Sequence, residues 1–475
     1  MAPSTTQIAL TAQGSSGSGQ VCPISATGKY INGLAFKPID WGGEGLPIIR
    51  IQNLTDPSKP MNRTTRKVDP IYIVQPGDLL VSWSATLDAF IWDREPALLN
   101  QHIFKVDPNT KLVSKKFLFY SLRRAIAQMI RSEHLHGSTM KHINRGPFLA
   151  HTIRVPSRTA QAQIVAEIEK QFSRLDEAVA NLKRVKANIK RYKAAVLKAA
   201  VEGRLVPTEA ELARREGRGY ETGVDLLQRI FSFRRRQWTK KGKYEEPMQP
   251  DTLGLPQLSE GWCWARLDAL ASIKGGITVD RKRQDPTARP VPYLRVANVQ
   301  RGYLDLEEIK SIDAPEAEIE ELRLMPGDIL FNEGGDRDKL GRGWIWEGQL
   351  PECIHQNHVF RARLFGLGLS AKLISWWGNT FGKDYFLREG KQTTNLASIN
   401  MTKLSAFPIP IPPSAEQCRI VAEVDRRLSI VREVEAEVDT NLKRAQALRH
   451  AVLTKAFGGG ATSALPASTP ASCVA

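Results

Sequence analysis

The chain has 475 residues, of which 42% are hydrophobic and 25% charged, a composition that can form ordinary globular cores and, at roughly 150 residues per domain, predicts at least two domains. Lys and Arg number 67 against 50 Asp and Glu, a net charge of +17, which indicates a polyanionic partner, either nucleic acid or an anionic membrane. No apolar run approaches the ~20 residues of a spanning helix, and five scattered cysteines without a C-x-x-C spacing fit a reducing compartment better than a disulfide framework or a zinc ribbon. We therefore expect a cytoplasmic protein that binds nucleic acid and no membrane.

The first part of the chain is predicted to be a disordered end followed by a mainly β domain. Residues 1–20 are rich in Ser, Thr, Gly and Gln, and they lack the basic and apolar regions of a signal peptide. A mixed, mainly β domain is expected over 21–158. Its signals are the β-branched stretch at 47–54 and the apolar run at 79–83, which follows the turn sequence Pro76-Gly77-Asp78.

A long helix is predicted over 159–203, and a second one in the same register over 414–457. In both, apolar residues recur every seven positions, and a 3.5-residue repeat kept over four heptads is typical of a left-handed coiled coil. Two amphipathic helices on separate cores are the alternative. If the helices pair, the residues expected to join them are Ile168, Leu175, Leu182, Ile189, Val196, Val424, Val431, Val438 and Val452.

Between the helices we expect a charged connector over 204–254, which includes Arg234-Arg235-Arg236, and then a second mainly β domain over 255–413. Prolines at 408, 410, 412 and 413 predict an extended lead into the second helix. The tail at 458–475 is rich in Gly, Ala, Ser, Pro and Thr and is expected to be disordered.

The two halves of the chain are copies of one another. Ile143-Asn144 recurs as Ile399-Asn400 and the stretch 164–167 recurs as 420–423, both at an offset of 256 residues. Upstream, with small shifts, 76–80 matches 326–330 and 47–51 matches 292–296. The predicted fold class is α+β, a tandem duplication of a mixed, mainly β domain followed by a long helix.

Catalytic signatures are missing from the sequence. It contains no G-x-x-x-x-G-K-[ST] phosphate loop, no [DNS]-P-P-[YF] segment of a base methylase and no H-x-E with P-C-x-x-C of a zinc deaminase. Cys353, His355 and His358 form a C-x-H-x-x-H cluster, but no fourth ligand is evident, so a loop ending in a strand is preferred over a metal site. We expect a binding protein with no catalytic residue, no metal and no cofactor of its own.

Polar loops are the candidate DNA-contacting parts. The loop 332–343 supplies glycines and cationic donors that can reach phosphates or guanine edges, whereas its counterpart 82–86 is shorter and nearly uncharged. A second pair of loops, 137–142 and 390–395, also differs between the copies. Different loops on a repeated frame fit two readers of different sequences, although drift after duplication would look the same. The candidate contacts are Ser84, Thr86, Lys141, His142, Arg337, Lys339, Arg342, Lys391, Gln392 and Thr393.

The first long helix is strongly basic between 183 and 193, whereas the second is acidic at Glu433, Glu435 and Glu437. Two uses of these cations remain open at this point. They can contact DNA, or they can pair with the acidic residues of the second helix.

In combination these features resemble the specificity subunit of type I restriction–modification enzymes, over nearly the whole chain. The segments that carry the resemblance are 33–37 leading into 48–54, Leu255-Pro256 followed by Gly261-Trp262, the glycine loop within 331–346, the run 412–421 and the closing stretch 451–457.

The resemblance implies two target recognition domains joined by two long helices that pack as an antiparallel coiled coil. It implies a subunit that reads a bipartite double-stranded DNA target, with the helices as a ruler between the half-sites. Two modification (methyltransferase) subunits and the restriction (motor–nuclease) subunits are the implied partners, and S-adenosylmethionine, ATP and Mg are expected on them rather than on this chain. Two other functions stay open, a coiled-coil assembly scaffold and an enzyme that modifies DNA itself.

Overall fold

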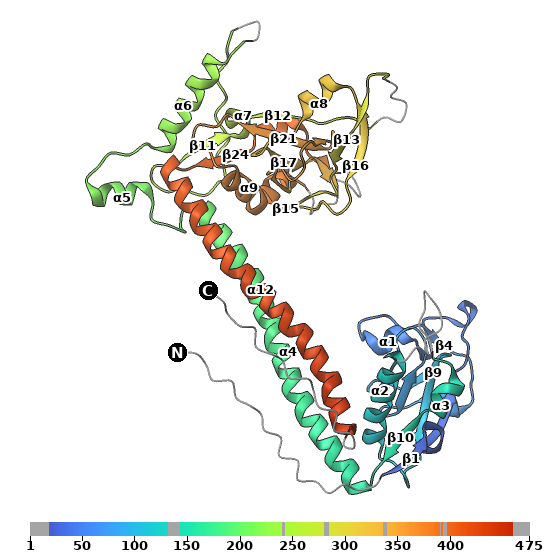
Figure 1. Ribbon diagram of the computed structural model, residues 1–475. Helices are drawn as coiled ribbons and strands as arrows, with labels where there is room; N and C mark the ends of the chain where they lie inside the picture. The colour runs from blue at the N-terminus through green and yellow to red at the C-terminus, as the bar shows by residue number, and fades with distance from the viewer. Residues whose placement is uncertain are drawn as a thin grey trace, which may run out of the picture. The chain divides into compact units, whose positions relative to one another are not determined.

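The computed structural model describes residues 19–131, 143–239, 243–279, 285–335, 340–389, 391–392 and 397–458 (Figure 1). The chain forms two compact units: unit 1 comprises the described residues of 1–184 and 438–475, and unit 2 those of 185–437. The ends expected to be disordered, 1–20 and 458–475, lie outside the described residues except for Gly19, Gln20 and Gly458.

Unit 1 contains two four-stranded sheets, in the orders β2-β9-β6-β7 and β4-β3-β8-β5, and a two-stranded ribbon of β1 and β10. The strands are β1 (Gln20–Pro23), β2 (Gly28–Asn32), β3 (Leu46–Ile49), β4 (Arg63–Thr64), β5 (Ile73–Val74), β6 (Leu79–Ser82), β7 (Asp88–Ile91), β8 (Ala97–Leu99), β9 (Ile103–Pro108) and β10 (Thr152–Val155). The helices are α1 (Ile51–Thr55), α2 (Lys115–Arg131), α3 (Arg145–Ala150) and the first part of α4 (Arg158–Val201), with the last part of α12 (Ser414–Phe457) and the 3-10 turns η1 (Ile24–Thr27), η2 (Pro38–Asp40) and η3 (Pro70–Tyr72).

Unit 2 repeats this plan with the sheets β12-β21-β17-β19 and β16-β13-β20, the ribbon β11-β24, and two additional small ribbons, β14-β15 and β18-β23-β22. The strands are β11 (Cys263–Arg266), β12 (Ala271–Lys274), β13 (Arg289–Leu294), β14 (Val299–Gln300), β15 (Tyr303–Leu304), β16 (Lys310–Ala314), β17 (Ile329–Asn332), β18 (Gly334–Gly335), β19 (Gly343–Ile345), β20 (Ile354–His355), β21 (Val359–Leu364), β22 (Lys391–Gln392), β23 (Ala397–Ser398) and β24 (Pro408–Ile411). The helices are α5 (Glu209–Glu216), α6 (Gly223–Arg236), α7 (Leu267–Leu270), α8 (Glu316–Leu322), α9 (Ala371–Thr380), α10 (Gly382–Glu389) and α11 (Met401–Ser405), together with the adjoining parts of α4 and α12.

The predicted fold class is confirmed: both copies combine a mixed sheet domain with a long helix, and Pro408–Ile411 is the extended lead into the second helix. The expected strand at 47–54 is only half right, because β3 ends at Ile49 and α1 begins at Ile51. The reason is Asn53, a buried side chain whose Oδ1 accepts the N–H of Arg50 at 3.1 Å and so closes a helical turn. Asn298 makes the same bond to the N–H of Arg295 in unit 2, at 2.9 Å.

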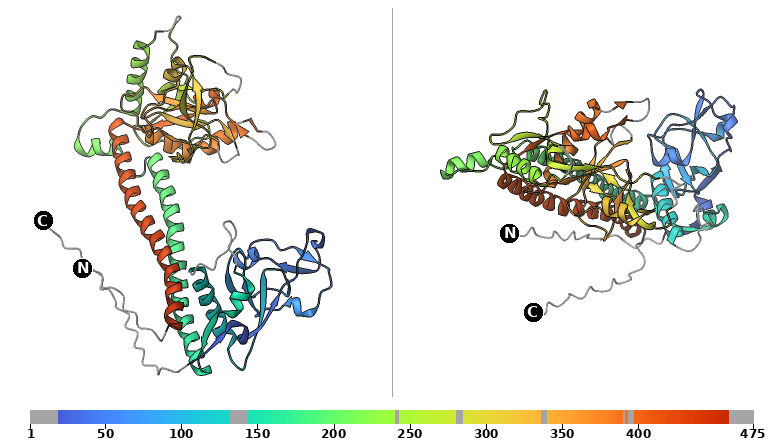
Figure 2. Two further views of the ribbon diagram at one scale, coloured as in Figure 1. Left: turned by 45° about the vertical axis from the view of Figure 1, so that its right-hand side comes forward. Right: turned by 90° about the horizontal axis from the view of Figure 1, so that it is seen from above.

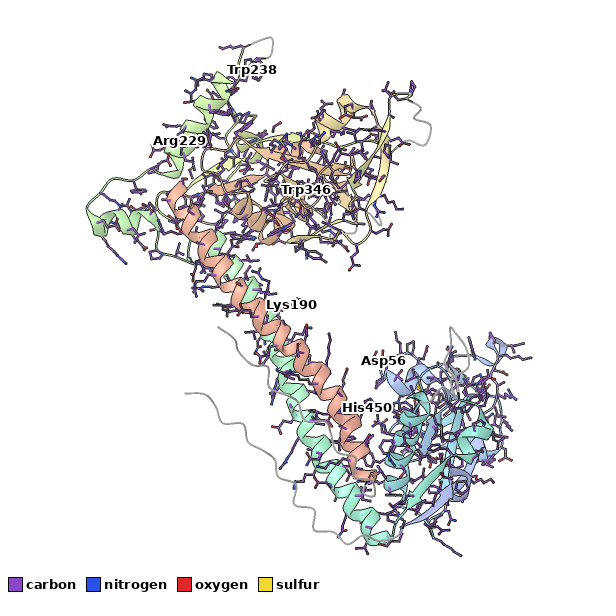
Figure 3. All side chains as sticks on the ribbon, in the orientation of Figure 1. Asp56, Lys190, Arg229, Trp238, Trp346 and His450 are labelled. Atoms are coloured by element: carbon purple, nitrogen blue, oxygen red, sulfur yellow. The ribbon has the colours of Figure 1, made fainter. Side chains whose placement is uncertain are left out.

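The Pro-Gly-Asp turns place a buried tryptophan in each unit. Gly77 and Gly327 have φ values of +91° and +95°, in the left-handed region that favours glycine. Their N–H groups donate to the carbonyl oxygens of Trp92 and Trp346, at 2.6 and 2.8 Å. Both tryptophans are almost completely buried, and Figure 3 shows Trp346 inside unit 2. In each unit, a turn that the sequence reveals by its motif thus bonds to a buried tryptophan that directly follows a strand.

A glutamine fixes the start of each long helix to the domain before it. The Oε1 atoms of Gln161 and Gln417 accept the N–H groups of Ser114 and Ser370, both at 2.8 Å. Their Nε2 atoms donate to the carbonyl oxygens of Pro156 and Pro412, both at 3.0 Å. Because both glutamines are buried, these bonds are shielded from water and hold helix and domain together.

The segment 204–254, predicted as a charged connector, is folded onto unit 2. It contains α5 and α6, each with a threonine N-cap in a capping box, Thr208 and Thr222. Leu226 and Ile230 of α6 are fully buried in the core that also holds Trp262. The sequence prediction rested on the charges of this segment, such as Arg234-Arg235-Arg236, whereas the fold of α6 depends on its apolar face.

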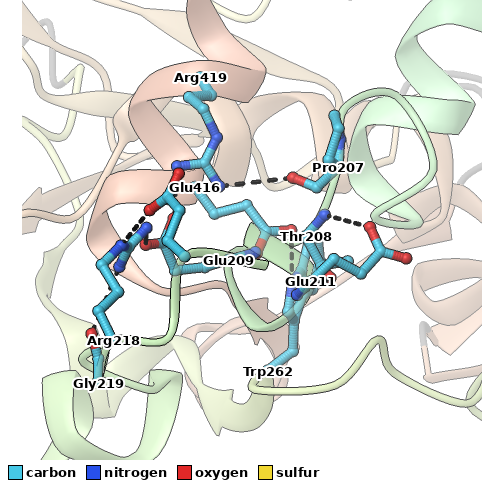
Figure 4. Close-up of polar contacts among 10 residues, drawn as sticks. Pro207, Thr208, Glu209, Glu211, Arg218, Gly219, Trp262, Glu416 and Arg419 are labelled. Carbon is cyan, nitrogen blue, oxygen red and sulfur yellow. Dashed lines mark hydrogen bonds and ion pairs between the residues drawn. The ribbon is translucent and has the colours of Figure 1, made fainter. Parts of the chain in front are cut away.

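A buried carboxylate joins this segment to the start of α12 (Figure 4). The carboxylate of Glu416 accepts the backbone N–H of Glu209 at 2.8 Å and the indole N–H of Trp262 at 2.9 Å. Glu209 in turn forms ion pairs with Arg218 and Arg419. Burial raises the pKa of Glu416. Unit 1 has Ala160 at the equivalent position, so this network belongs to the second copy alone.

His355 is expected to make unit 2 sensitive to acid. It is fully buried, its Nδ1 lies 2.7 Å from the carbonyl oxygen of Val359, and burial, with smaller effects of Arg361 and Arg363, lowers its pKa to about 4. The folded-state pKa therefore lies below the unfolded value of about 6.5, so the stabilisation is complete above pH 6.5 and is lost as the pH falls towards 4. Over that range we expect a loss of about 3 kcal/mol in the free energy of unfolding.

His355→Leu should abolish this pH dependence, because unit 1 buries Leu99 at the equivalent position. Denaturant unfolding at pH 7, 5.5 and 4 would measure it. Replacing the exposed His450 is the control and should leave the slope in place. A slope unchanged in His355→Leu would show that another group causes it.

Candidate DNA interface

In each unit the long helices lie side by side and run in opposite directions (Figure 1 and Figure 2). Of the residues expected to join them, six are buried and three are half-buried; the buried ones are Ile168, Ile189, Val196, Val424, Val431 and Val438, and the half-buried ones are Leu175, Leu182 and Val452. Ile168 also belongs to the sheet-domain core of unit 1, and Val196 and Val424 to that of unit 2. These positions therefore pack against the domains as well as against the other helix.

Ion pairs accompany the seam. Lys193, which interrupts the apolar seam of α4, pairs with Glu435 of α12 in unit 2, and Arg449 pairs with Asp176 in unit 1. Arg184 and Arg191 instead donate to asparagines of their own helix, and Lys190 is exposed (Figure 3). Opposite-charge pairing between the helices thus uses Lys193 and leaves most of the basic face of α4 in solvent.

The described strands beside the two polar loops of unit 2 pair with one another. Strand β18 follows directly after β17 and pairs with β23, with Gly334 opposite Ser398 and Gly335 opposite Ala397. Strand β22 pairs with the other side of β23. Loops almost sixty residues apart in the sequence therefore meet at one edge of the domain.

Both units build the base of this loop pair in the same way. The N–H of Trp83 donates to His102 O, and the N–H of Ile143 donates to Trp83 O. In unit 2 the N–H of Glu333 donates to His358 O, and the N–H of Ile399 donates to Glu333 O. The backbone frame is therefore duplicated along with the fold.

The side chains on this shared frame differ. The rings of Trp83 and His102 meet edge to face with centroids 4.7 Å apart, whereas His358 Nδ1 and Glu333 Oε2 lie 2.5 Å apart. The His358 side chain is 55% exposed, so it is accessible to a ligand. A common frame with an aromatic pair in one copy and a polar pair in the other offers two different chemical surfaces.

Two of the candidate contacts are buried in the structure, Ser84 and Arg342. Arg342 is only 9% exposed, because its carbonyl pairs with the N–H of Asn332 as the hairpin closes, and its guanidinium turns inward to Val296 O at 3.3 Å. Ser84 is buried, with its carbonyl accepting the hydroxyl of Ser82 at 3.1 Å. Both side chains are therefore largely shielded from solvent in this structure.

The remaining candidates are placed as follows. Thr86 is exposed. Lys391 and Gln392 are described by their backbone only, as strand β22. Outside the described residues lie Lys141, His142, Arg337, Lys339 and Thr393. Trp83 and His358 also belong to this site and were not among the sequence candidates. The sequence did indicate them: 102–104 matches 358–360, and a predicted strand precedes each loop.

The C-x-H-x-x-H residues do not converge. Cys353 is buried with its Sγ against the carbonyl of Ile354, His355 faces Val359 O, and His358 faces Glu333. Within the described part of the chain, no group of three His, Cys, Asp or Glu is arranged to hold a metal ion.

The comparisons with known proteins agree with this architecture. A family model described as the type I restriction modification DNA specificity domain matches residues 18–191. Two similar relatives are the type I restriction enzyme EcoBI specificity subunit of Escherichia coli, 22% identical over 94% of this chain and 87% of that one, and the EcoDI specificity subunit of Escherichia coli, 23% identical over 78% of this chain and 75% of that one. A chain in a solved structure described as the basis of complex assembly and conformational transition of the type I R-M system shares the fold, with a TM-score of 0.56, 16% identity, and coverage of 94% of this chain and 98% of that one.

Residues 18–191 thus constitute a DNA specificity domain of the type I restriction–modification class. The similarity to a whole specificity subunit of a type I restriction enzyme extends over both copies, since it covers 94% of this chain. Among the described residues, no helix combines the length and the apolar character needed to cross a membrane.

Proposed function

We propose that this chain is the DNA sequence-specificity subunit of a type I restriction–modification complex, and that it reads a bipartite double-stranded target with one domain per half-site. The observation that carries the proposal is the duplicated loop frame, in which the bonds around Trp83 and Glu333 repeat while the side chains differ. Base readout requires side chains that differ where sequences differ, and a common frame keeps their position constant.

Affinity and specificity are expected to come from different residues. Exposed cations would contact phosphates and make binding salt-dependent, whereas the loops at the duplicated frame would choose the bases. The candidates for base contacts are His358 and Thr86, together with the residues predicted from the sequence in the loops 137–142, 336–339 and 390–395.

The finer assignments rest on the family. We propose that the chain is not itself catalytic, that it assembles with two modification subunits and with restriction subunits, and that it functions in the cytoplasm. S-adenosylmethionine, ATP and Mg would be bound by those partners. The absence of nucleotide and methylase motifs from the sequence supports this division of labour.

Target-specific methylation tests the proposal. The chain would be co-expressed with its modification subunit in a host without other adenine methylases, and the methylated motif read from genomic DNA. A split motif that requires this chain is the expected result. Methylation by the chain alone would support the enzyme alternative, and DNA binding without sequence preference by the assembled complex would support a coiled-coil scaffold.

The ruler role makes a separate prediction. Inserting one heptad after Lys193 and one after its ion-pair partner Glu435 adds about 10.5 Å to both helices and keeps the seam in register. We expect the gap between the half-sites to grow by up to about three base pairs, at about 3.4 Å per pair, with both half-sites unchanged. Methylome sequencing measures both quantities, and a changed half-site would contradict the ruler.

A further inference from the structure

Unit 1 contains a cavity of about 400 Å³ that DNA recognition does not explain. It lies between α2, the β1–β10 ribbon and the end of α12, and among the residues that line it are Arg124, Gln128, Arg154 and Phe457. A volume of this size lies within the range of small ligand sites.

The lining is cationic. Arg124 and Arg154 supply the charge, and none of the described lining residues is Asp or Glu. Arg124 lies over the ring of Phe457, 5.9 Å from its centroid, and its Nε is buried without a hydrogen-bond acceptor in the described part of the chain. Burial lowers the pKa of Arg124. No ion pair within the described residues involves Arg124 or the exposed Arg154, so the cavity holds positive charge that an anion would balance.

Unit 2 has a cavity in the equivalent place, of about 580 Å³. At the constant offset of 256, Ser121 and Ala125 are replaced by Trp377 and Phe381, and Gln128 by Asp384. Residues 254–256, which lead into β11, form one wall of this second cavity. Both copies of the fold therefore contain this cavity. In unit 2 it is lined by aromatic side chains and by a segment of the chain itself.

We propose that the unit 1 cavity is a docking site for an acidic peptide segment of a partner protein. In unit 2 the extended segment 254–256 lines the equivalent cavity, which favours a peptide as the partner of the unit 1 cavity. The guanidinium groups of Arg124 and Arg154 select carboxylates, which accept charge-assisted hydrogen bonds from arginine. The segments 1–18 and 459–475 of this chain contain no Asp or Glu, so a partner must supply the acidic side chains. Val21, Ile153 and Phe457 would contact the apolar parts of the same peptide.

Fluorescence anisotropy on the full-length chain tests the proposal. The probe is a dye-labelled peptide that copies residues 252–258 but has glutamate in place of Leu253 and Gln257; the matched neutral peptide has glutamine at both positions. We expect the acidic peptide to bind at least tenfold more tightly than the neutral one. The pair Arg124→Ala and Arg154→Ala should weaken it at least tenfold. Arg388→Ala, at the rim of the unit 2 cavity, is the matched control and should change nothing.

The single variant Arg154→Ala separates loss of binding from loss of folding. This side chain is exposed, and its removal leaves the packing of Arg124 on Phe457 intact. A severalfold weakening with an unchanged melting temperature would support the site. Equal binding of both peptides, or wild-type affinity in the arginine variants, would overturn the proposal. Displacement of the peptide by an unrelated 20-base-pair duplex would overturn it too, because the cavity would then be a phosphate site.

Discussion

Replacing residues 204–413 by the corresponding segment of a relative with a different target should change one half of the recognition sequence and leave the other half intact. The exchanged segment contains the unit 2 loop frame with Glu333 and His358, whereas Trp83 and His102 stay in place. Each base pair no longer read should cost about 1–3 kcal/mol of binding free energy. Three such pairs would then lower the affinity for the old half-site at least a hundredfold. Gel-shift titrations with the assembled complex on hybrid oligonucleotides measure the change.

The boundary of this exchange is itself part of the prediction. Replacing only 255–413 separates Leu226 and Ile230 of α6 from the core into which they pack. That chimera should be less stable than the one exchanged at 204, although both carry the same loops. A chimera exchanged at 204 that alters both half-sites would show that the domains do not read independently.

Asp328→Asn should destabilise unit 2 by about 3 kcal/mol. Asp328 is 1% exposed, and its two carboxylate oxygens accept the Nε and Nη2 of Arg363, both at 2.8 Å. Its Oδ2 also accepts the N–H of Met325 at 2.8 Å. The amide keeps an acceptor for Met325 but leaves the arginine without its counter-ion, and breaking a buried pair in this way costs about 3–5 kcal/mol, reduced here because Arg363 is 35% exposed.

Unit 1 provides the matched control. Asp78 makes the same turn bond, accepting the N–H of Gln75 at 2.8 Å, but Asp107 stands where unit 2 has Arg363. Asp78→Asn should therefore cost at most about 1 kcal/mol, because the amide still accepts the N–H of Gln75, although less strongly than a carboxylate, and no counter-ion is lost. Chemical denaturation of the two variants gives the comparison, and equal losses would show that the ion pair contributes nothing beyond the turn.

The repeat and the long helices were predictable because their signals are local or periodic. The heptad seam that includes Ile189 and Val431 is visible without knowledge of the fold, and a turn such as Pro326-Gly327-Asp328 carries its geometry in its residue types. Because the chain is duplicated, each weak sequence pattern occurs twice, and the order of the domains could therefore be derived from one chain.

The site was less predictable because its residues meet only through tertiary pairing. Gly335 and Ala397 are neighbours across the β18–β23 ribbon, a relation that neither loop shows alone. Arg342 is a residue type that often contacts DNA, but the closing hairpin turns its guanidinium inward, towards Val296 O. The same limit applies to α6, whose Ile230 is buried only because the helix folds back onto unit 2.

Helices α5 and α6 also bear on how many molecules can bind this chain. A protein that recognises only features shared by the two copies would find two equivalent sites on every chain. A protein that recognises α5, α6 or the Glu416 network would find one, since unit 1 has Ala160 where unit 2 has Glu416. A tandem duplication with one singly built segment therefore presents the shared surface twice and the α5–α6 surface once among its described residues.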